Sequence, residues 1–543
     1  MILAILLVLV MIPGAGFAQD EEGVQAPAQA APTEQFFKQY DLTGGLNTKQ
    51  SSYMIQPNES PLMQNLTLDT TFAPSKRPGY AVHSTVSVLI TKGLESIYRV
   101  YFNNGDYADL VHTGNVFYAS NNNGPYSIIA PPMLVTDGSH YAYETYQNRA
   151  YIIDQSETQS VYSYGADITA ETSFPVKGKY ILSSKGRLWI GGSSSDDTVQ
   201  ISLSGPLQYI RNDPNIVYFT SPYGDPHDQN QWLIENNGGF IRLPNDGDVI
   251  TGMQTVNTFM LIFRKNSIFV VESPVTGSDG IAKTTVRQVS QGIGCIAPRS
   301  LVKMEAGPIY FLGKRGVYSY DGSNIEYLSL KVEPDIGRIG DELGLTYKRQ
   351  YWLVQFGSDT SEMVYDIDIK AWTKYDSIPL SCGFTAQGDV DLGALFIGMS
   401  NDGFVYKFGD AAFDNGATFD CKYKTKTMDM GNSFLFKRFR NILVDLRTSL
   451  STVEVQYSID RDRVTGSVEL LNSSSGTLWG IAKWGESTWG GEIFTPMVPL
   501  PQSAVGRVIQ LEFISNAIDD DFRIFGYGLR YATYPHRGIP VSR

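Results

Sequence analysis

SIYRVYFNNGDYADLVHTGNVFYA, residues 96–119, consists of three short runs rich in Tyr, Phe and Val that are separated by Asn103-Asn104-Gly105 and Thr113-Gly114. Aromatic and β-branched residues favour strands. An Asn-Gly pair between two alternating runs favours a tight hairpin, because both positions tolerate a positive φ. The stretch therefore predicts three consecutive antiparallel strands.

The same theme recurs roughly every 40 to 60 residues, the spacing of four-stranded propeller blades. Further units are expected from strands at residues 141–146, 179–183, 259–264, 308–312, 351–356 and 392–399. Residues 205–245 are richer in Asn, Asp, Pro and Gly and are expected to form a loop or insertion between blades. Long helical periodicity is nearly absent. The pattern predicts an all-β fold with a β-propeller of six or seven blades over residues 85–416.

The chain after residue 416 has a different composition and is predicted to form a second domain, residues 417–543. Residues 453–459, VEVQYSI, alternate between apolar and polar side chains, which indicates a strand with one buried and one wet face. Similar strands are expected at residues 419–428, 437–446, 508–514 and 523–533. We expect an antiparallel β-sandwich here.

Three tryptophans on a Gly-rich stretch of this domain, Trp479, Trp484 and Trp489, are each followed by glycine. They could pack a loop onto the sandwich, contact a neighbouring subunit, since Trp is enriched in interface hot spots, or stack against a sugar. The sequence leaves these three interpretations open.

The first 36 residues are unlike the rest. Ile2–Met11 is an unbroken apolar run, and Gly16 and Ala18 fit a small-residue cleavage site, so residues 1–18 resemble a signal peptide. The run is too short for a stable membrane span, although an uncleaved anchor remains an alternative. Residues 19–36 are rich in Glu, Gln, Ala and Pro and are expected to be a disordered linker.

Residues 37–84 are expected to form an extended N-terminal arm. It contains Gly44-Gly45-Leu46-Asn47-Thr48, then Asn58-Glu59-Ser60, and Lys76-Arg77-Pro78-Gly79-Tyr80. This opening, followed by Tyr/Phe/Val-rich repeats, resembles tail and neck proteins of bacterial viruses, especially the β-propeller nozzle and packaged-DNA stabilisation proteins of short-tailed phages. Gly294–Val302, Gly307–Gly313 and Gly316–Gly322 resemble stretches recurrent in the same proteins, as does a terminal sandwich with Trp-Gly loops.

The resemblance implies a structural protein of the virion. It implies a homo-oligomeric ring, often of six copies, that docks below the portal or adaptor with other tail proteins and forms part of the conduit for DNA retention and ejection. DNA would pass without sequence-specific binding. The candidate subunit-contact residues are those of the arm and the Trp-Gly stretch: Gly44, Gly45, Leu46, Asn47, Arg77, Pro78, Gly79, Trp479, Trp484 and Trp489. Deleting residues 37–80 is expected to abolish assembly and to leave the sandwich folded.

Composition is compatible with this interpretation. The net charge of −13 argues against tight binding of DNA phosphates, which needs clustered Lys and Arg, but suits a wall along which DNA slides. The three cysteines are far apart, which excludes a disulfide framework and suggests buried thiols. The five histidines show no metal-ligand spacing.

The sequence nominates no catalytic, cofactor-binding or metal-binding residue, because it contains no nucleophile elbow, P-loop or dinucleotide fingerprint. We therefore expect a protein that is not an enzyme and has no cofactor. The alternative, favoured by residues 1–18 and the Trp-Gly stretch, is an exported bacterial β-propeller, secreted or periplasmic, that binds carbohydrate or protein at the cell surface. A propeller hydrolase or lyase is disfavoured by the missing motifs.

Overall fold

The protein is described from a computed structural model, which covers residues 34–68, 72–83, 93–129, 138–156, 162–165, 170–171, 174–203, 209–272, 274–276, 282–304, 307–356, 361–387, 391–448, 452–471, 495–516 and 522–534. Over these residues, the regular structure consists of strands and four short 3-10 helices, η1 (Gln229–Trp232), η2 (Ile234–Asn236), η3 (Pro298–Ser300) and η4 (Leu330–Asp335). The predicted all-β fold is confirmed.

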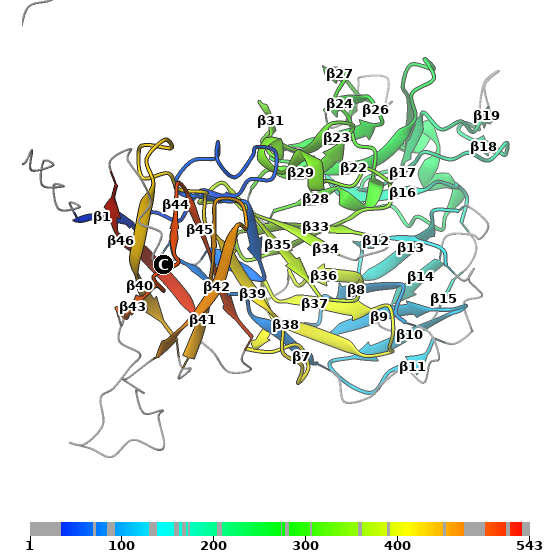
Figure 1. Ribbon diagram of the computed structural model, residues 1–543. Coiled ribbons are helices and arrows are strands. Elements are labelled where there is room, and N and C mark those ends of the chain that lie inside the picture. Colours follow the sequence, from blue (N-terminus) through cyan, green and yellow to red (C-terminus); the bar gives the residue numbers. More distant parts are fainter. Residues whose placement is uncertain are drawn as a thin grey trace, which may run out of the picture.

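Six four-stranded antiparallel sheets are arranged as the blades of a propeller (Figure 1). Blade 1 contains β8 (Ser96–Tyr101), β9 (Tyr107–Thr113), β10 (Val116–Asn121) and β11 (Ser127–Ile128). Blade 2 contains β12 (Tyr141–Tyr146), β13 (Arg149–Asp154), β14 (Tyr162–Gly165) and β15 (Ala170–Glu171). Blade 3 contains β16 (Tyr180–Ser184), β17 (Arg187–Gly191), β20 (Ile216–Phe219) and β21 (Gly239–Arg242).

The other separate blades follow in chain order. Blade 4 contains β22 (Ile250–Val256), β23 (Phe259–Arg264), β24 (Ser267–Val271) and β27 (Val286–Gln291). Blade 5 contains β28 (Val302–Lys303), β29 (Ile309–Gly313), β30 (Gly316–Tyr320) and β31 (Ile325–Tyr327). The last blade contains β36 (Leu380–Thr385), β37 (Leu395–Met399), β38 (Val405–Ala411) and, from the N-terminal end of the chain, β7 (Gly79–Val82).

A seventh four-stranded unit lies between blade 5 and the last blade and belongs to a larger sheet. It contains β32 (Leu343–Tyr347), β33 (Gln350–Gln355), β34 (Ser361–Asp366) and β35 (Ala371–Asp376). The innermost strands contact one another in the order β8, β12, β16, β22, β28, β32 and β36, and β36 contacts β8. The ring therefore closes with this unit as blade 6 and the last blade as blade 7, within the predicted range of six or seven.

Apolar side chains fill the space between neighbouring blades. Six of the seven junctions have a buried cluster of their own, and the junction between blades 5 and 6 belongs to a larger cluster. In the first of them, Phe117 of blade 1 packs with Tyr141 and Ile152 of blade 2. Two hairpin turns show why the local sequence folds this way, since Gln147-Asn148 (φ 46° and 66°) and Lys185-Gly186 (φ 54° and 68°) both have the positive φ pair of a type I′ turn.

Blade 3 differs from the expectation. The sequence predicts that residues 205–245 form a loop or insertion between blades. Instead, β18 (Thr198–Gln200) pairs with β19 (Tyr209–Arg211) as a hairpin outside the blade, while β20 and β21 complete it. The prediction was wrong because Ile216–Phe219 is a short apolar run flanked by residues typical of turns. Hydrophobic periodicity alone does not identify a strand in such a short run. A similar small hairpin, β25 (Val275–Thr276) with β26 (Ala282–Lys283), accompanies blade 4.

The N-terminal arm, residues 34–83, is distributed over the molecule. Its strand β7 pairs antiparallel with β38 and completes blade 7, so that the two ends of the propeller sequence meet in one sheet. The other strands of the arm are β1 (Glu34–Gln39), β2 (Gly45–Leu46), β3 (Glu59–Ser60), β4 (Leu62–Gln64), β5 (Leu66–Leu68) and β6 (Pro74–Lys76). Because β1 begins at Glu34, the predicted disordered linker is too long by three residues, which pair with β46.

Two further sheets form the C-terminal module, defined here as the strands after residue 416 with the arm strands that join them (Figure 1). The strands after residue 416 are β39 (Cys421–Lys424), β40 (Lys437–Arg447), β41 (Thr452–Ile459), β42 (Val464–Leu471), β43 (Met497–Pro499), β44 (Val505–Gly506), β45 (Ile509–Ser515) and β46 (Arg523–Thr533). One sheet runs β43-β40-β46-β6-β5, with β1 beside β46 and β44 beside β40. The other runs from blade 6 through β4 to β39, β45, β41 and β42.

The antiparallel sandwich expected from residues 417–543 is not confirmed in that form. Strand β4 pairs parallel with β35 and antiparallel with β39, which makes blade 6 and the C-terminal strands one continuous sheet. One buried cluster contains Tyr310 of blade 5 as well as Val455 and Leu529 of the module. The module therefore shares its core with the propeller, and the arm supplies strands to both.

Candidate functional site

The first segment predicted to carry function, Gly44–Asn47, is buried against its own chain. Strand β2 pairs parallel with β3, and Leu46 is 2% exposed. Asn47 donates a hydrogen bond from Nδ2 to Glu59 Oε2 at 2.8 Å. Gly45 has a φ of 70°, and a Cβ there would lie 2.7 Å from the Cβ of Ala371 in blade 6. The Gly-Gly pair is therefore required by close packing of the arm on the blade.

Lys331 of η4 holds this part of the arm from the propeller side. Its carbonyl oxygen accepts hydrogen bonds from the backbone N–H groups of Thr48 (3.1 Å) and Lys49 (3.0 Å). Its ammonium group lies 2.9 Å from Glu59, whose carboxylate is almost completely buried. Burial alone would raise the pKa of Glu59, but hydrogen bonds from the Gln56 backbone, Lys331 and Asn47 lower it, so the Glu59 carboxylate is ionised at neutral pH.

The second segment, Arg77-Pro78-Gly79, ends in a buried ion pair. The Arg77 guanidinium donates from Nη1 to Asp414 Oδ1 at 2.9 Å and from Nη2 to Asp414 Oδ2 at 2.7 Å. It also stacks on Phe419, with its central carbon 3.8 Å from the ring centroid. Burial would lower the pKa of Arg77, but Asp414 raises it above its ordinary value. Bidentate pairs of this kind fix orientation as well as charge.

Two further groups surround Arg77. Its Nε donates to Asn65 Oδ1 at 2.9 Å, and the Asn65 amide hydrogen-bonds the carboxylate of Asp376 at the end of blade 6. Glu362 of β34 is completely buried, and neither of its carboxylate oxygens has a hydrogen-bond partner among the described residues. Burial raises the pKa of Glu362 to about 8, with the charge of Arg77 opposing the rise. Glu362 is thus mostly protonated at neutral pH.

The subunit-contact role of the arm residues stays a prediction, because the contacts described above lie within one chain. Leu46, Asn47 and Arg77 are each less than 5% exposed, and a Cβ on Gly79 would lie 2.0 Å from the carbonyl oxygen of Phe413. The arm residues form a clamp between the propeller and the C-terminal module of the same chain, in which Gly44 and Pro78 remain partly exposed. The predicted contact residues Trp479, Trp484 and Trp489 lie outside the described residues.

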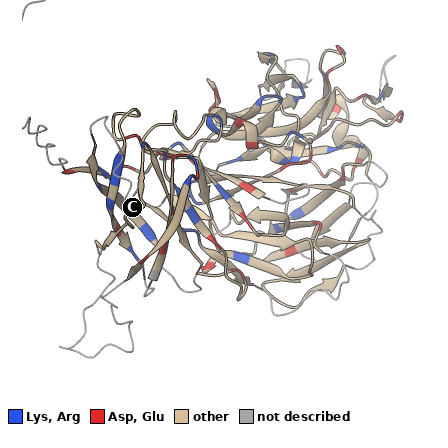
Figure 2. Ribbon diagram, in the orientation of Figure 1, with Lys and Arg blue, Asp and Glu red and all other residues tan. Residues whose placement is uncertain are grey.

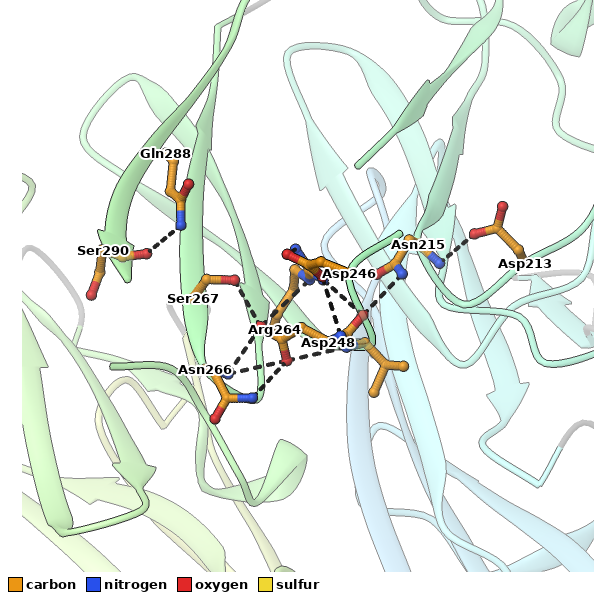
Figure 3. Close-up of polar contacts among 10 residues, drawn as sticks. Asp213, Asn215, Asp246, Asp248, Arg264, Asn266, Ser267, Gln288 and Ser290 are labelled. Atoms are coloured by element: carbon orange, nitrogen blue, oxygen red, sulfur yellow. Dashed lines mark hydrogen bonds and ion pairs between the residues drawn. The ribbon is translucent and has the colours of Figure 1, made fainter. Parts of the chain in front are cut away.

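A cluster of hydrogen-bonded polar side chains joins blades 3 and 4 (Figure 3). Arg264, at the end of β23, is completely buried; it pairs with Asp246 and donates to the carbonyl oxygen of Asp248 at 2.8 Å. Asn215 donates to the same carbonyl at 2.9 Å, and the Asp248 carboxylate accepts from Ser267 Oγ at 2.8 Å. All these groups fix the turn between β21 and β22, which indicates a structural role.

The central channel of the propeller is bridged at one end. His140 precedes β12, Arg299 lies in η3 before β28, and Asp341 precedes β32. His140 Nε2 lies 3.0 Å and Arg299 Nη1 3.1 Å from Asp341 Oδ1, and Arg299 also donates to the carbonyl oxygen of Ser381 at 3.1 Å. Blades 2 and 6 are not neighbours in the ring, so the contact of His140 with Asp341 crosses the channel.

Metal-ligand clusters and reactive thiols were sought in the described part of the chain. There, no three His, Cys, Asp or Glu side chains lie together as a metal site would need. No helix among the described residues is long and apolar enough to span a bilayer. Cys295, Cys382 and Cys421 are buried, as expected, and burial raises the pKa of Cys295 and of Cys382 to about 12. Such thiols are poor nucleophiles.

An exposed hollow that the sequence analysis missed lies at one end of the C-terminal module. It has a volume of about 450 Å³ and is lined by Tyr53, Ser433, Phe436, Asp460, Arg461, Arg463, Arg507 and Val508. A second hollow of about 300 Å³ shares Tyr53, Arg461 and Val508 with it. The residues come from separate parts of the chain, and the only local sequence signal was the charged turn between two predicted strands, Asp460–Arg463.

No protein family matches the sequence, and no curated protein matches it. Among solved structures, virginiamycin B lyase from Staphylococcus aureus is similar with a TM-score of 0.39 and 10% identity, over 61% of this chain and 99% of that one. A chain of the mitotic checkpoint complex has a TM-score of 0.34 and 9% identity, over 57% and 87%. A chain of the complex of BBS1N with ARL6DN has a TM-score of 0.36 and 9% identity, over 62% and 98%.

Proposed function

We propose that the chain is a structural subunit of a phage tail or neck, which assembles into a ring around the path of DNA retention and ejection. In this role it is not an enzyme, and its partners are further copies of itself, the portal or adaptor, and other tail proteins. The resemblance of the arm and of Gly294–Gly322 to nozzle-type proteins motivates the proposal.

The observation that carries it is the interlocking of one N-terminal segment with blade 6, blade 7 and both sheets of the C-terminal module. Strand β7 completes blade 7, β4 joins blade 6 to the C-terminal module, and β1, β5 and β6 extend the opposite sheet. Buried charges at Arg77 and Glu59 secure this segment from both sides. A subunit that must keep its shape beside pressurised DNA benefits from such interlocking, whereas a hydrolase or lyase needs a pocket with reactive groups.

The conduit would lie between copies. Because His140, Arg299 and Asp341 bridge the channel of each propeller, a duplex is excluded from that channel. A ring of copies provides a wider opening, and the acidic net charge of −13 keeps the phosphates from binding to its wall.

Mass photometry and negative-stain imaging of purified residues 19–543, alone and with a portal complex, test the proposal. Rings, or density bound below the portal, support it. A chain that stays monomeric at all concentrations and ignores the portal overturns it, and leaves the exported surface-binding propeller as the alternative. A glycan array with the same protein then tests carbohydrate binding, for which the Trp-Gly pairs at Trp479, Trp484 and Trp489 are the motivating observation.

A further inference from the structure

The hollow at the end of the C-terminal module has the composition of a protein interface. Three arginines, Arg461, Arg463 and Arg507, surround it together with Tyr53 and Phe436. Two large apolar side chains lie next to these residues in sequence and are strongly exposed, Met54 at 72% and Phe434 at 74%. Arginine, aromatic residues and methionine are the side chains enriched at protein–protein contacts.

The arginines are held in place and keep donors available. Arg461 stacks on Tyr53, with its central carbon 5.2 Å from the ring centroid, and donates from Nε to the Tyr53 hydroxyl at 3.3 Å. Arg507 stacks on Phe436 at 4.9 Å. Arg463 pairs with Asp460 at 3.2 Å, and the Asp460 carboxylate also accepts the Arg507 backbone N–H at 2.7 Å. Stacked guanidinium groups lose little entropy when a carboxylate binds them.

Charge is divided unevenly between the two parts of the chain. Residues 1–416 contain 28 Lys and Arg against 43 Asp and Glu, whereas residues 417–543 contain 15 against 13. Figure 2 shows Lys and Arg along several strands of the C-terminal module. The part of the chain that contains the propeller therefore has an excess of acidic residues, whereas three arginines line the hollow, so the two are opposite in charge.

We propose that this hollow binds the acidic propeller of a second copy of the chain, so that copies associate head to tail. The proposal rests on the ring proposed above and specifies its interface. Two different surfaces meet in such a contact, which makes it heterologous, and repeated heterologous contacts close into a ring when the rotation permits. Tyr53, Met54 and Phe434 supply the apolar centre, and the arginines pair with carboxylates of the neighbour.

Charge reversal tests the proposal in the otherwise intact chain, as R461E/R463E/R507E. The matched control K265E/K314E/K348E changes the net charge by the same amount at exposed lysines of the propeller. A neutral variant, R461Q/R463Q/R507Q, covers the case in which charge reversal impairs folding, and thermal unfolding reports on folding in each. The concentration at half-assembly is measured by mass photometry, at low and at high salt, with wild type in parallel.

We expect the concentration at half-assembly of the hollow variants to be about ten-fold or more above that of wild type, and that of the control to be unchanged. High salt should weaken the assembly of wild type, because it screens the charges at the contact. If wild type forms rings and the hollow variants form them equally well, the inference is overturned while the ring stands. Equal loss in the control variant also overturns it, because net charge would then be the cause. If the hollow variants assemble normally but lose binding to a short DNA duplex, the occupant is phosphate, and the inference fails. A monomeric wild type overturns the ring and the inference together.

Discussion

Arg77 and Asp414, which are separated by 337 positions in the chain, form a bidentate ion pair with nitrogen–oxygen distances of 2.9 and 2.7 Å. The Arg77 side chain is completely buried and that of Asp414 is 5% exposed. The pair lies where the arm, blade 7 and the start of the C-terminal module meet. A long-range contact of this kind makes the fold of each part dependent on the others.

The first prediction concerns this pair. Arg77→Met leaves the Asp414 carboxylate buried without its partner, and breaking a buried pair in this way costs about 3–5 kcal/mol of the free energy of unfolding. Arg349→Met is the matched control, because it breaks the exposed pair of Arg349 with Asp368 at 2.8 Å and costs at most about 1 kcal/mol. Urea unfolding followed by tryptophan fluorescence measures both. Equal effects of the two substitutions would contradict a structural role for the Arg77 clamp.

The second prediction concerns the pH dependence that Glu362 imposes. Its pKa is about 8 in the folded protein and 4.5 when unperturbed, so the folded state binds the proton more tightly. The stability from Glu362 is therefore full below about pH 4.5 and is lost as pH rises toward 8, by up to about 1.4 kcal/mol per pH unit. Glu362→Gln removes this dependence and is expected to flatten the stability profile between pH 5 and 8.

Asp368→Asn is the control for that measurement. A hydrogen bond from Arg349 lowers the pKa of Asp368, so the carboxylate contributes its stability above its ordinary pKa and loses it only in more acidic solution. Its profile between pH 5 and 8 should parallel that of wild type. Unfolding midpoints in urea at pH 5, 6.5 and 8 distinguish the variants, and a Glu362→Gln profile parallel to wild type would show that this carboxyl is ionised in the folded protein.

The local hairpins of the propeller could be predicted from sequence because their signal is local. Residues 96–119 form β8, β9 and β10, and residues 452–459 form a strand whose apolar side chains Val453, Val455 and Ile459 are buried. In both places the alternation of apolar and polar residues and the neighbouring turn residues indicate the same strand. Both signals depend only on residues a few positions apart, which is the range over which hydrophobic periodicity is informative.

The interlocked arm could not be predicted, because its pairings are non-local. Strand β7 meets β38 more than 300 residues later, and nothing in the four residues Gly79–Val82 specifies that partner. A lone arginine is usually exposed, so the burial of Arg77 follows only from where Asp414 lies. The arginine-lined hollow likewise combines Tyr53, Arg461 and Arg507 from three distant segments.

The third prediction concerns the thiols. Cys295, Cys382 and Cys421 are completely or almost completely buried, and the pKa of Cys295 and of Cys382 is raised to about 12 by burial. Because the thiolate is the reactive form, a thiol reagent at pH 8 is expected to modify none of the three in the native protein and all three in denaturant. The absorbance of the chromophore that the reagent releases gives the number of modified thiols. Rapid modification of even one native thiol would show that the junction containing it opens readily.

The last prediction revises the expected effect of removing the arm. Deletion of residues 37–80 was expected to leave the C-terminal part folded. However, it removes β4, which lies between β35 and β39, together with Met63 and Leu66, two completely buried members of the core that the propeller and the C-terminal module share. We now expect the deleted chain to lose cooperative unfolding of the propeller and the C-terminal module together, as seen by circular dichroism during heating. Replacing residues 275–283 by a short Gly-Ser linker removes the small β25–β26 hairpin, in which Val275 is 71% exposed, and serves as the control, with an unchanged transition. A soluble arm-less chain that keeps the wild-type transition would mean that the clamp joins parts already stable by themselves.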